Sequence, residues 1–73
     1  MIELIAAVEG SIHYGLQAGL GCFGAALGVG MVGMKAVEAV GRNPGAFGRI
    51  LTQAILGMAL AEAVAFYALY LGQ

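Results

Sequence analysis

The sequence predicts an all-α membrane protein that folds as a hairpin of two transmembrane helices, and three observations support this prediction. Hydrophobic residues make up 62% of the 73 residues. Charged residues make up only 10%, far below the roughly 25% that is typical of soluble domains. Two long apolar runs are present, and a short polar segment with a turn motif separates them.

The same composition excludes several other classes of protein. Disordered chains are poor in apolar residues, and collagens have Gly at every third position. A net charge of −1 with three basic residues provides no surface for nucleic acid. Cys22 is the single cysteine, so we expect no intrachain disulfide and no metal site, and a packing role for Cys22. We also expect no cofactor.

The first apolar run extends from Ile12 to Met34, 23 residues without a formal charge. As a helix it measures about 35 Å, enough to cross a hydrocarbon core of about 30 Å. Lipid admits only helices and closed barrels, and two spans cannot close a barrel. We therefore predict a first helix over about residues 5–41. Glu3 and Glu9 near its start argue against a cleaved signal peptide, which begins with basic residues.

A polar segment follows the first run, and we predict a loop over about residues 42–46. It contains Arg42-Asn43-Pro44-Gly45, in which Pro fixes its own φ and biases the preceding residue away from the helical conformation. All three basic residues of the chain lie between positions 35 and 49. The positive-inside rule therefore places the loop on the cytoplasmic side and both termini on the opposite side.

The second apolar run extends from Ile50 to Leu71, and its single charged residue is Glu62. Its length predicts a second membrane-crossing helix over about residues 47–72. The whole chain, residues 1–73, then forms one membrane hairpin with no second domain.

Glycines are concentrated in the first run and fall on two flanks of a helical wheel. One flank contains Gly21, Gly24 and Gly28, and the other contains Gly15, Gly19, Ala26, Gly30 and Gly33. Small residues let membrane helices approach closely, so this helix is suited to a position between two neighbours. One hairpin supplies only one of them, and we therefore predict a homo-oligomeric ring of identical hairpins. The alternative is the general enrichment of glycine in membrane helices.

Glu62 lies near the middle of the second run, and neither run contains a basic residue to pair with it. A charged group at this depth costs about 2.5–3.5 kcal/mol on insertion scales. We expect the carboxyl to be neutral when it faces lipid and to ionise where water or a cation reaches it. This is the chemistry of an ion-translocating site. The alternative is an inert carboxylic acid that is hydrogen-bonded to a neighbour.

The residues around Glu62 favour a proton as the transported ion. A dehydrated Na⁺ requires several oxygen ligands, whereas the nearby side chains are apolar apart from the phenol of Tyr67. Gln17, Gln53 and Thr52 are all more than a helical turn away from Glu62 in depth.

These motifs resemble the c subunits of F-type ATP synthases, the proteolipids that form the membrane rotor. Three segments carry the resemblance: Gly24-x-Ala26-x-Gly28-x-Gly30, Glu38-x-x-x-Arg42-Asn43-Pro44, and residues 54–63 around the carboxylate. The chain departs from the common pattern at Ala26, where Gly is frequent, and at Asn43, where many bacterial members have Gln. Two spans distinguish it from the four-helix V-type relatives.

The resemblance implies that Glu62 binds one proton per subunit and exchanges it at the interface with the stator, the a subunit. Rotation of the ring then passes through Arg42, Asn43 and Pro44 to the central-stalk subunits gamma and epsilon, and ATP is made elsewhere in the complex. The chain itself is then non-catalytic, and its other partners are membrane lipids and copies of itself. The resemblance also implies an energy-coupling membrane, the inner membrane of a bacterium.

Two further implications concern the ion. Tyr67 matches a position whose hydroxyl helps to orient the carboxyl in some members of the family. Sodium-binding members have a Gln in the first helix and a Ser or Thr after the Glu, at the places where this chain has Val29 and Ala63. The resemblance therefore implies coupling to H⁺ and not to Na⁺.

Two alternative functions remain on the sequence alone. A paired multidrug transporter also uses a membrane Glu, but it has about four spans and a cavity lined by aromatic residues, whereas this chain has no Trp. A structural hairpin, in which Glu62 only fixes assembly, is the other alternative.

His13 and Glu9 are spaced for an i, i+4 pair at the membrane edge.

Overall fold

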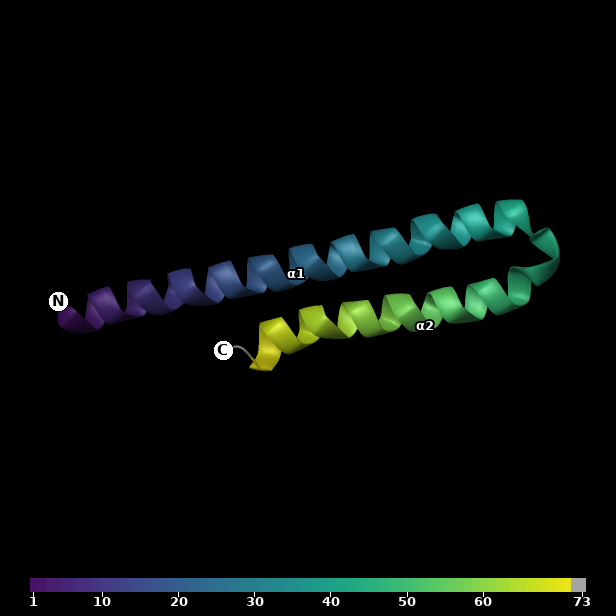
Figure 1. Cartoon of the computed structure of the whole chain (residues 1–73). Coiled ribbons are helices and arrows are strands. Elements are labelled where there is room, and N and C mark those ends of the chain that lie inside the picture. The colour runs from purple at the N-terminus through teal and green to yellow at the C-terminus, as the bar shows by residue number, and fades with distance from the viewer. Residues whose placement is uncertain (72–73) are drawn as a thin grey trace.

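The computed structural model describes residues 1–71 and shows two long helices that lie side by side and antiparallel (Figure 1). Helix α1 spans Ile2–Arg42 and helix α2 spans Phe47–Phe66. A 3-10 turn, η1, covers Pro44–Ala46 between them, and a π-helical turn, η2, continues α2 over Tyr67–Leu71. The described residues contain no strand. The predicted all-α hairpin is therefore confirmed.

The turn between the helices forms where the sequence places its single proline. Asn43, the residue before Pro44, leaves the helical region with φ −143° and ψ 75°. Its N–H donates to the carbonyl of Ala39 at 2.9 Å, and its own carbonyl accepts the N–H of Ala46 at 3.0 Å. The first bond ends α1 and the second begins η1. None of the described residues at the turn adopts a left-handed conformation.

The helix bounds differ from the expected ones at two places. α1 begins at Ile2 and not near residue 5, because the first residues contain no helix breaker. The α-helical part of the second helix ends at Phe66, and a wider π turn follows it, whereas we expected one helix to residue 72. Residue 72 lies outside the described residues.

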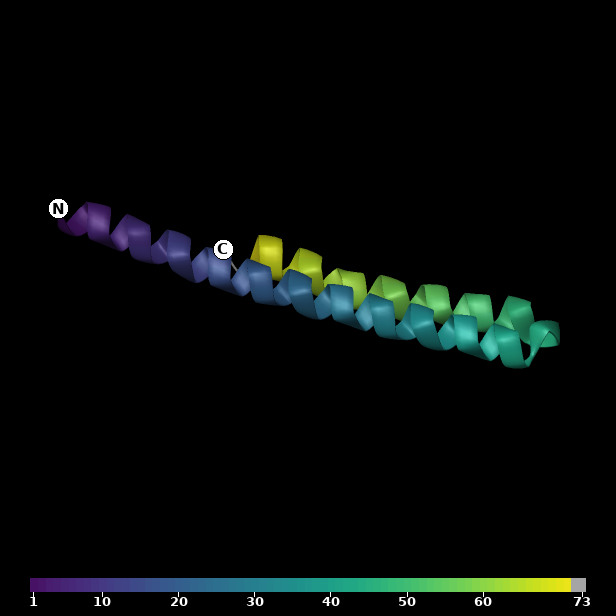
Figure 2. The ribbon, with the colours of Figure 1, turned by 90° about the horizontal axis from the view of Figure 1, so that it is seen from above.

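The two helices contact each other through small residues. Ala18 and Ala25 of α1, Ala54 of α2 and Ala68 of η2 are buried between the helices. A Cβ built on Gly28 would lie 3.3 Å from the Cβ of Ala61. Ala and Gly side chains are small and so permit close helix packing, and the two views together show the helices side by side over the length of α2 (Figure 1, Figure 2).

Only part of the glycine pattern faces the second helix. A Cβ on Gly21 would clash with Ala68, and Gly28 faces Ala61. Gly24, which the helical wheel places on the same flank, has no atom within 4 Å of its Cβ position. On the other flank, Gly33 is the one described glycine that faces α2: a Cβ built on it would lie 4.0 Å from the Sδ of Met58. The seam between the helices is centred on alanines at seven-residue spacing, which the distribution of glycines did not indicate.

Both helices are long and apolar enough to cross a membrane. The face of α1 with the large side chains is exposed in the single chain: Leu16, Leu20, Phe23, Leu27, Met31 and Met34. A surface of this kind is covered by lipid or by other protein chains in the membrane. The protein is accordingly a membrane protein.

Candidate functional site

Glu62 lies on α2 directly after Ala61, a residue of the helix–helix seam. The register of the hairpin fixes its depth: Gly21 lies opposite Ala68, Gly28 opposite Ala61, and Val32 opposite Gly57. Glu62 is therefore level with Leu27, well inside the apolar part of both helices. Its side chain is exposed in the single chain because it points to the side of the seam.

The carboxyl of Glu62 has no compensating group within the hairpin. Among the described residues it makes no hydrogen bond and no ion pair. Lys35, Arg42 and Arg49 all lie at the loop end of the hairpin. A buried carboxylate without a partner is costly in an apolar medium, so this position calls for a partner from outside the single hairpin.

The described structure places no set of oxygen ligands beside Glu62. The side chains of Val29 and Ala63 contain no oxygen. Measured along the helices, Gln17 and Gln53 are each more than about 12 Å away in depth. The hydroxyl of Thr52 donates to the carbonyl of Gly48 at 2.9 Å. Within residues 1–71 there is also no group of three or more His, Cys, Asp or Glu side chains that could hold a metal ion.

Glu62 and Tyr67 lie on different flanks of the hairpin. Leu51 and Met58 line an apolar groove on one flank, and spacings of eleven and four residues put Glu62 on that flank. Arg49 and Gln53 line a second groove on the other flank, and spacings of eighteen and fourteen residues put Tyr67 there. Tyr67 is 67% exposed, and no hydrogen bond joins it to Glu62 among the described residues. One chain therefore does not bring the phenol and the carboxyl together.

A different tyrosine links α1 to the last turn of the second helix. The hydroxyl of Tyr14 donates to the backbone carbonyl of Leu69 at 2.9 Å. Leu69 lies within the π turn, so the phenol bonds to a carbonyl of an irregular helical segment. This bond was not predictable, because nothing local in the sequence relates residues 55 positions apart.

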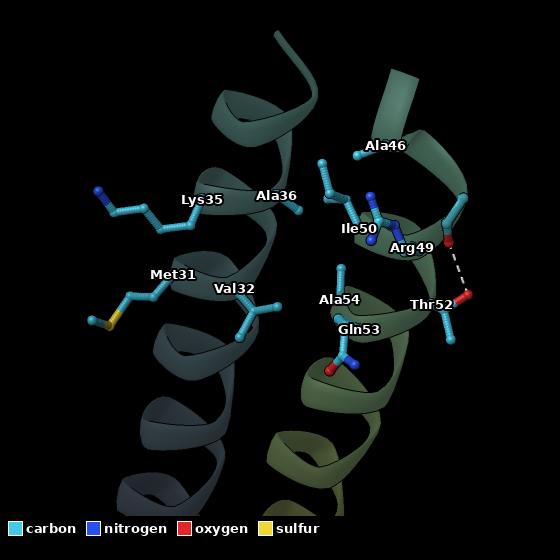
Figure 3. Close-up of a pocket in the computed structure, with 11 residues that line it drawn as sticks. Met31, Val32, Lys35, Ala36, Ala46, Arg49, Ile50, Thr52, Gln53 and Ala54 are labelled. Atoms are coloured by element: carbon cyan, nitrogen blue, oxygen red, sulfur yellow. Dashed lines mark hydrogen bonds between the residues drawn. The ribbon is translucent and has the colours of Figure 1, made fainter. Parts of the chain in front are cut away.

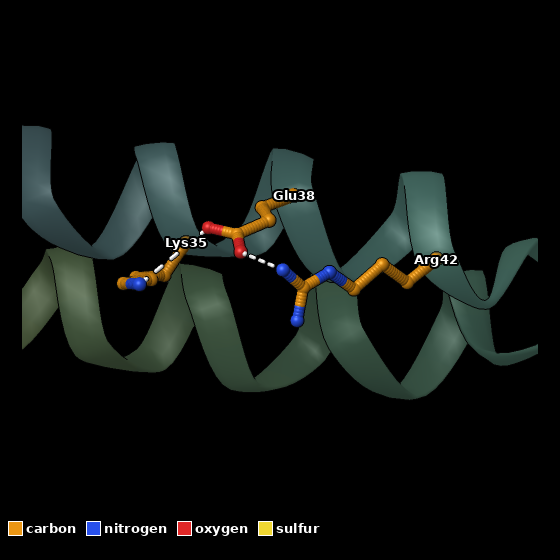
Figure 4. A network of polar contacts seen from close by, with 3 residues as sticks. All are labelled: Lys35, Glu38 and Arg42. Atoms are coloured by element: carbon orange, nitrogen blue, oxygen red, sulfur yellow. Dashed lines mark hydrogen bonds and ion pairs between the residues drawn. The ribbon is translucent and has the colours of Figure 1, made fainter.

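The loop end carries a small charge network, which Figure 4 shows. Glu38 accepts Arg42 Nη2 at 2.8 Å on one oxygen and Lys35 Nζ at 3.5 Å on the other. The side chains of Arg42 and Lys35 are 79% and 74% exposed, so the pairs are weak surface pairs. Asn43 and Pro44 are exposed beside them. The three predicted loop residues are thus exposed at the loop end of the hairpin.

The remaining predicted residues do not gather into a second site among the described residues. Gly30 and Ala26 are exposed on α1, and Cys22 is half-buried. His13 and Glu9 are both exposed, and no ion pair joins them in the described part of the chain.

Comparison with known proteins gives consistent matches. The family model for the C subunit of ATP synthase matches residues 12–72. An ATP synthase c subunit from Dehalococcoides mccartyi is 46% identical over 69 residues, which cover 94% of this chain and 82% of that protein. The c subunits from Geotalea uraniireducens and Geobacter sulfurreducens are 47% and 46% identical over 55 residues, 75% of this chain and 60% of each relative. No solved structure matches.

Proposed function

Because the chain belongs to the ATP synthase C-subunit family and so is a rotor subunit of an F-type ATP synthase, we propose that Glu62 is its proton-binding residue. One observation carries this proposal: a single carboxyl lies at mid-depth on an apolar helix, exposed beside the seam and unpaired among the described residues. Such a group is accessible to an external partner and is neutral in lipid.

The proposed cycle follows from the protonated and the ionised states of the carboxyl. Facing lipid, Glu62 holds its proton and the ring turns freely. At the stator, the a subunit, water and a cation reach the carboxyl, which releases its proton and takes up another. The chain itself is non-catalytic in this scheme, and ATP is made in another part of the complex.

The ion is H⁺ and not Na⁺ in this proposal. A sodium site requires several converging oxygens, and the side chains at the depth of Glu62 supply one carboxyl. Tyr67 joins the site from a neighbouring copy. In a ring, the flank of one hairpin meets the opposite flank of the next, so a Glu62 flank faces a Tyr67 flank.

The loop and the membrane complete the proposed arrangement. Arg42, Asn43 and Pro44 contact the central-stalk subunits gamma and epsilon on the cytoplasmic side, and both termini lie on the opposite side. The excess of basic residues at the loop supports this orientation. The named relatives are bacterial, which supports the inner membrane of a bacterium as the location.

The open glycine flank supports the ring and provides its test. Gly30 has no atom within 4 Å of its Cβ position, whereas Gly28 faces Ala61. We expect Gly30→Leu to prevent ring closure while the single hairpin still folds, because the new side chain enters only the space between copies. Gly28→Leu overpacks the seam within one hairpin, which typically costs about 1–3 kcal/mol, and should lower helix content on heating. Native mass spectrometry and circular dichroism measure the two effects.

An intact ring from the Gly30→Leu variant would show that this flank is not an interface between copies. Gly30→Ala is the matched control. It adds one methyl group where many membrane helix contacts have Ala, and it should leave the ring mass unchanged.

The state of Glu62 can be tested by chemical labelling. A hydrophobic carbodiimide reacts with protonated carboxyl groups, so it should label Glu62 before Glu3, Glu9 or Glu38 in detergent-solubilised protein. Labelling should fall as the pH rises, because ionisation removes the reactive form. Peptide mapping identifies the labelled residue. Equal labelling of all four carboxyls would contradict a neutral Glu62, and strong protection by Na⁺ would contradict the choice of H⁺.

A further inference from the structure

Tyr14 makes the one side-chain hydrogen bond that joins α1 to the second helix among the described residues. Its hydroxyl donates to the backbone carbonyl of Leu69 at 2.9 Å, across 55 positions of the chain. The other side-chain hydrogen bonds and ion pairs of the described residues each lie within one helix. The two helices are therefore joined at one definite polar point, in addition to their apolar packing.

Tyr14 occupies a position of the helix–helix seam. It lies four residues before the buried Ala18 and seven before Gly21, which faces Ala68, so these residues share one face of α1. Tyr14 is half-buried, whereas the residues on either side of it are exposed. The phenol thus takes the place that Ala and Gly take elsewhere along the seam, and it adds a polar contact there.

The acceptor of this bond, Leu69, lies in the same turn as Tyr67. The π-helical turn η2 spans Tyr67–Leu71. Ala68, between the two residues, is buried and faces Gly21 of α1. This turn is therefore held to α1 twice, by packing at Ala68 and by the hydrogen bond at Leu69, and Tyr67 directly precedes both contacts.

The form of this turn decides where the side chain of Tyr67 points. An α turn and a π turn rotate the chain by different angles per residue, because their hydrogen bonds span different numbers of residues. Isolated π turns occur frequently at functional sites. With Ala68 and Leu69 held to α1, conversion to an α turn would rotate Tyr67 away from its present flank. The bond from Tyr14 opposes that conversion.

The present direction of Tyr67 is the one that the proposed proton site requires. Tyr67 follows Gln53 by fourteen residues, and Gln53 lines the groove on this flank of the hairpin (Figure 3). The copies of a cyclic ring are related by rotation, so this flank meets the Glu62 flank of the next copy at equal depth. Tyr67 is five residues, about 7.5 Å, from the depth of Glu62, and helical side chains lean toward the N-terminus, here toward that depth.

We propose that Tyr14 is a positioning residue for the proton site of the neighbouring copy. Its hydroxyl holds the π turn, the turn keeps the phenol of Tyr67 on its flank, and that phenol donates a hydrogen bond to the Glu62 carboxyl of the next hairpin. Tyr14 acts only through Tyr67. The inference rests on the proposed function, because it needs a ring in which Glu62 binds the proton.

The experiment measures the rate of carbodiimide labelling of Glu62 at neutral pH, with the full chain in the assembly that it forms in mild detergent. The variants are Tyr14→Phe, Tyr67→Phe and the double variant, since Phe keeps the ring and removes only the hydroxyl. The hydrogen bond to the carboxyl must break before the reagent attacks, so each single variant should be labelled about fivefold faster than the parent. Because Tyr14 acts through Tyr67, the double variant should be no faster than Tyr67→Phe alone, whereas independent effects multiply.

Two further measurements separate positioning from general stabilisation. Tyr70→Phe removes a hydroxyl from the same turn, on a ring that stacks against Phe66 with centroids 6.2 Å apart, and it should be labelled at the parent rate. Native mass spectrometry should give the parent ring mass for every variant, which shows that a faster reaction does not come from loss of assembly.

Three outcomes would overturn the proposal. Labelling of the Tyr14→Phe variant at the parent rate would show that its hydroxyl has no influence on the site. Multiplied effects in the double variant would show that Tyr14 stabilises the hairpin without acting through Tyr67. The parent rate in the Tyr67→Phe variant would remove the phenol from the site. In each case, labelling of Glu62 before the other carboxyls of the parent would still support the proton site, so the two proposals fail separately.

Discussion

Replacing Glu62 with Gln is expected to abolish proton transport while the protein still assembles in the membrane. The amide has nearly the same shape as the protonated carboxyl, so packing beside the seam is kept. It cannot release a proton, so the ring has no charge to exchange at the stator. Because Glu62 is the one carboxyl within the apolar part of the hairpin, no other group takes over its role.

The measurement is proton uptake by membrane vesicles containing the whole complex, followed with a pH-sensitive dye. Transport by the Glu62→Gln variant should fall to the level of vesicles that lack the complex. Glu62→Asp keeps a titratable group on an arm one methylene shorter, and it should retain part of the transport. Glu9→Gln makes the same chemical change at an exposed carboxyl outside the apolar runs and should transport within about twofold of the parent. Proton transport by the Glu62→Gln variant would refute the proposed mechanism.

The hairpin was predictable because its determinants are local. The apolar runs and Pro44 fix the helices and the turn between them, since a proline and its preceding residue limit the conformations that the chain can adopt. The mid-depth position of Glu62 was predictable for the same reason, as depth in a helix is a matter of counting residues.

The contacts between the helices were harder to predict. The glycines dominate the composition of the first run, but the seam is centred on Ala18 and Ala25, and Gly24 lies beside it. Which small residues face α2 depends on the rotation of one helix against the other, and that rotation is set by all contacts together. The bond from Tyr14 to Leu69 likewise depends on how the two helices pair and has no local signal in the sequence.

The relation between Glu62 and Tyr67 was predictable in part from local sequence and in part only from the structure. The family resemblance placed them in one site, yet five residues correspond to about 140° around a helix, so they cannot face the same way. Helical spacing from the residues that line the two grooves puts Glu62 and Tyr67 on opposite flanks. A site made from both residues therefore requires two copies, and the hairpin alone is half of it.

Reversing the charge of Arg42 is expected to uncouple proton flow from ATP synthesis without preventing assembly. Arg42→Glu removes the 2.8 Å pair with Glu38 and places a second carboxylate beside it at the tip of the hairpin. In a ring, every copy carries this change, so a circle of positive side chains becomes a circle of negative ones. A stalk surface that is complementary to positive charge binds such a ring less well. The side chain is 79% exposed and outside the apolar runs, so the helix–helix seam is unaffected.

The test compares ATP synthesis driven by a proton gradient with passive proton flow in the same vesicles. In the Arg42→Glu variant, synthesis should fall at least about tenfold, as expected for the loss of an interface contact worth more than about 1.4 kcal/mol, while proton flow and ring mass remain. Arg42→Lys keeps the charge at the tip and should retain most of the synthesis. Coupled synthesis at the parent rate in the Arg42→Glu variant would mean that the loop is only a solvated turn, and that torque reaches the stalk through other residues.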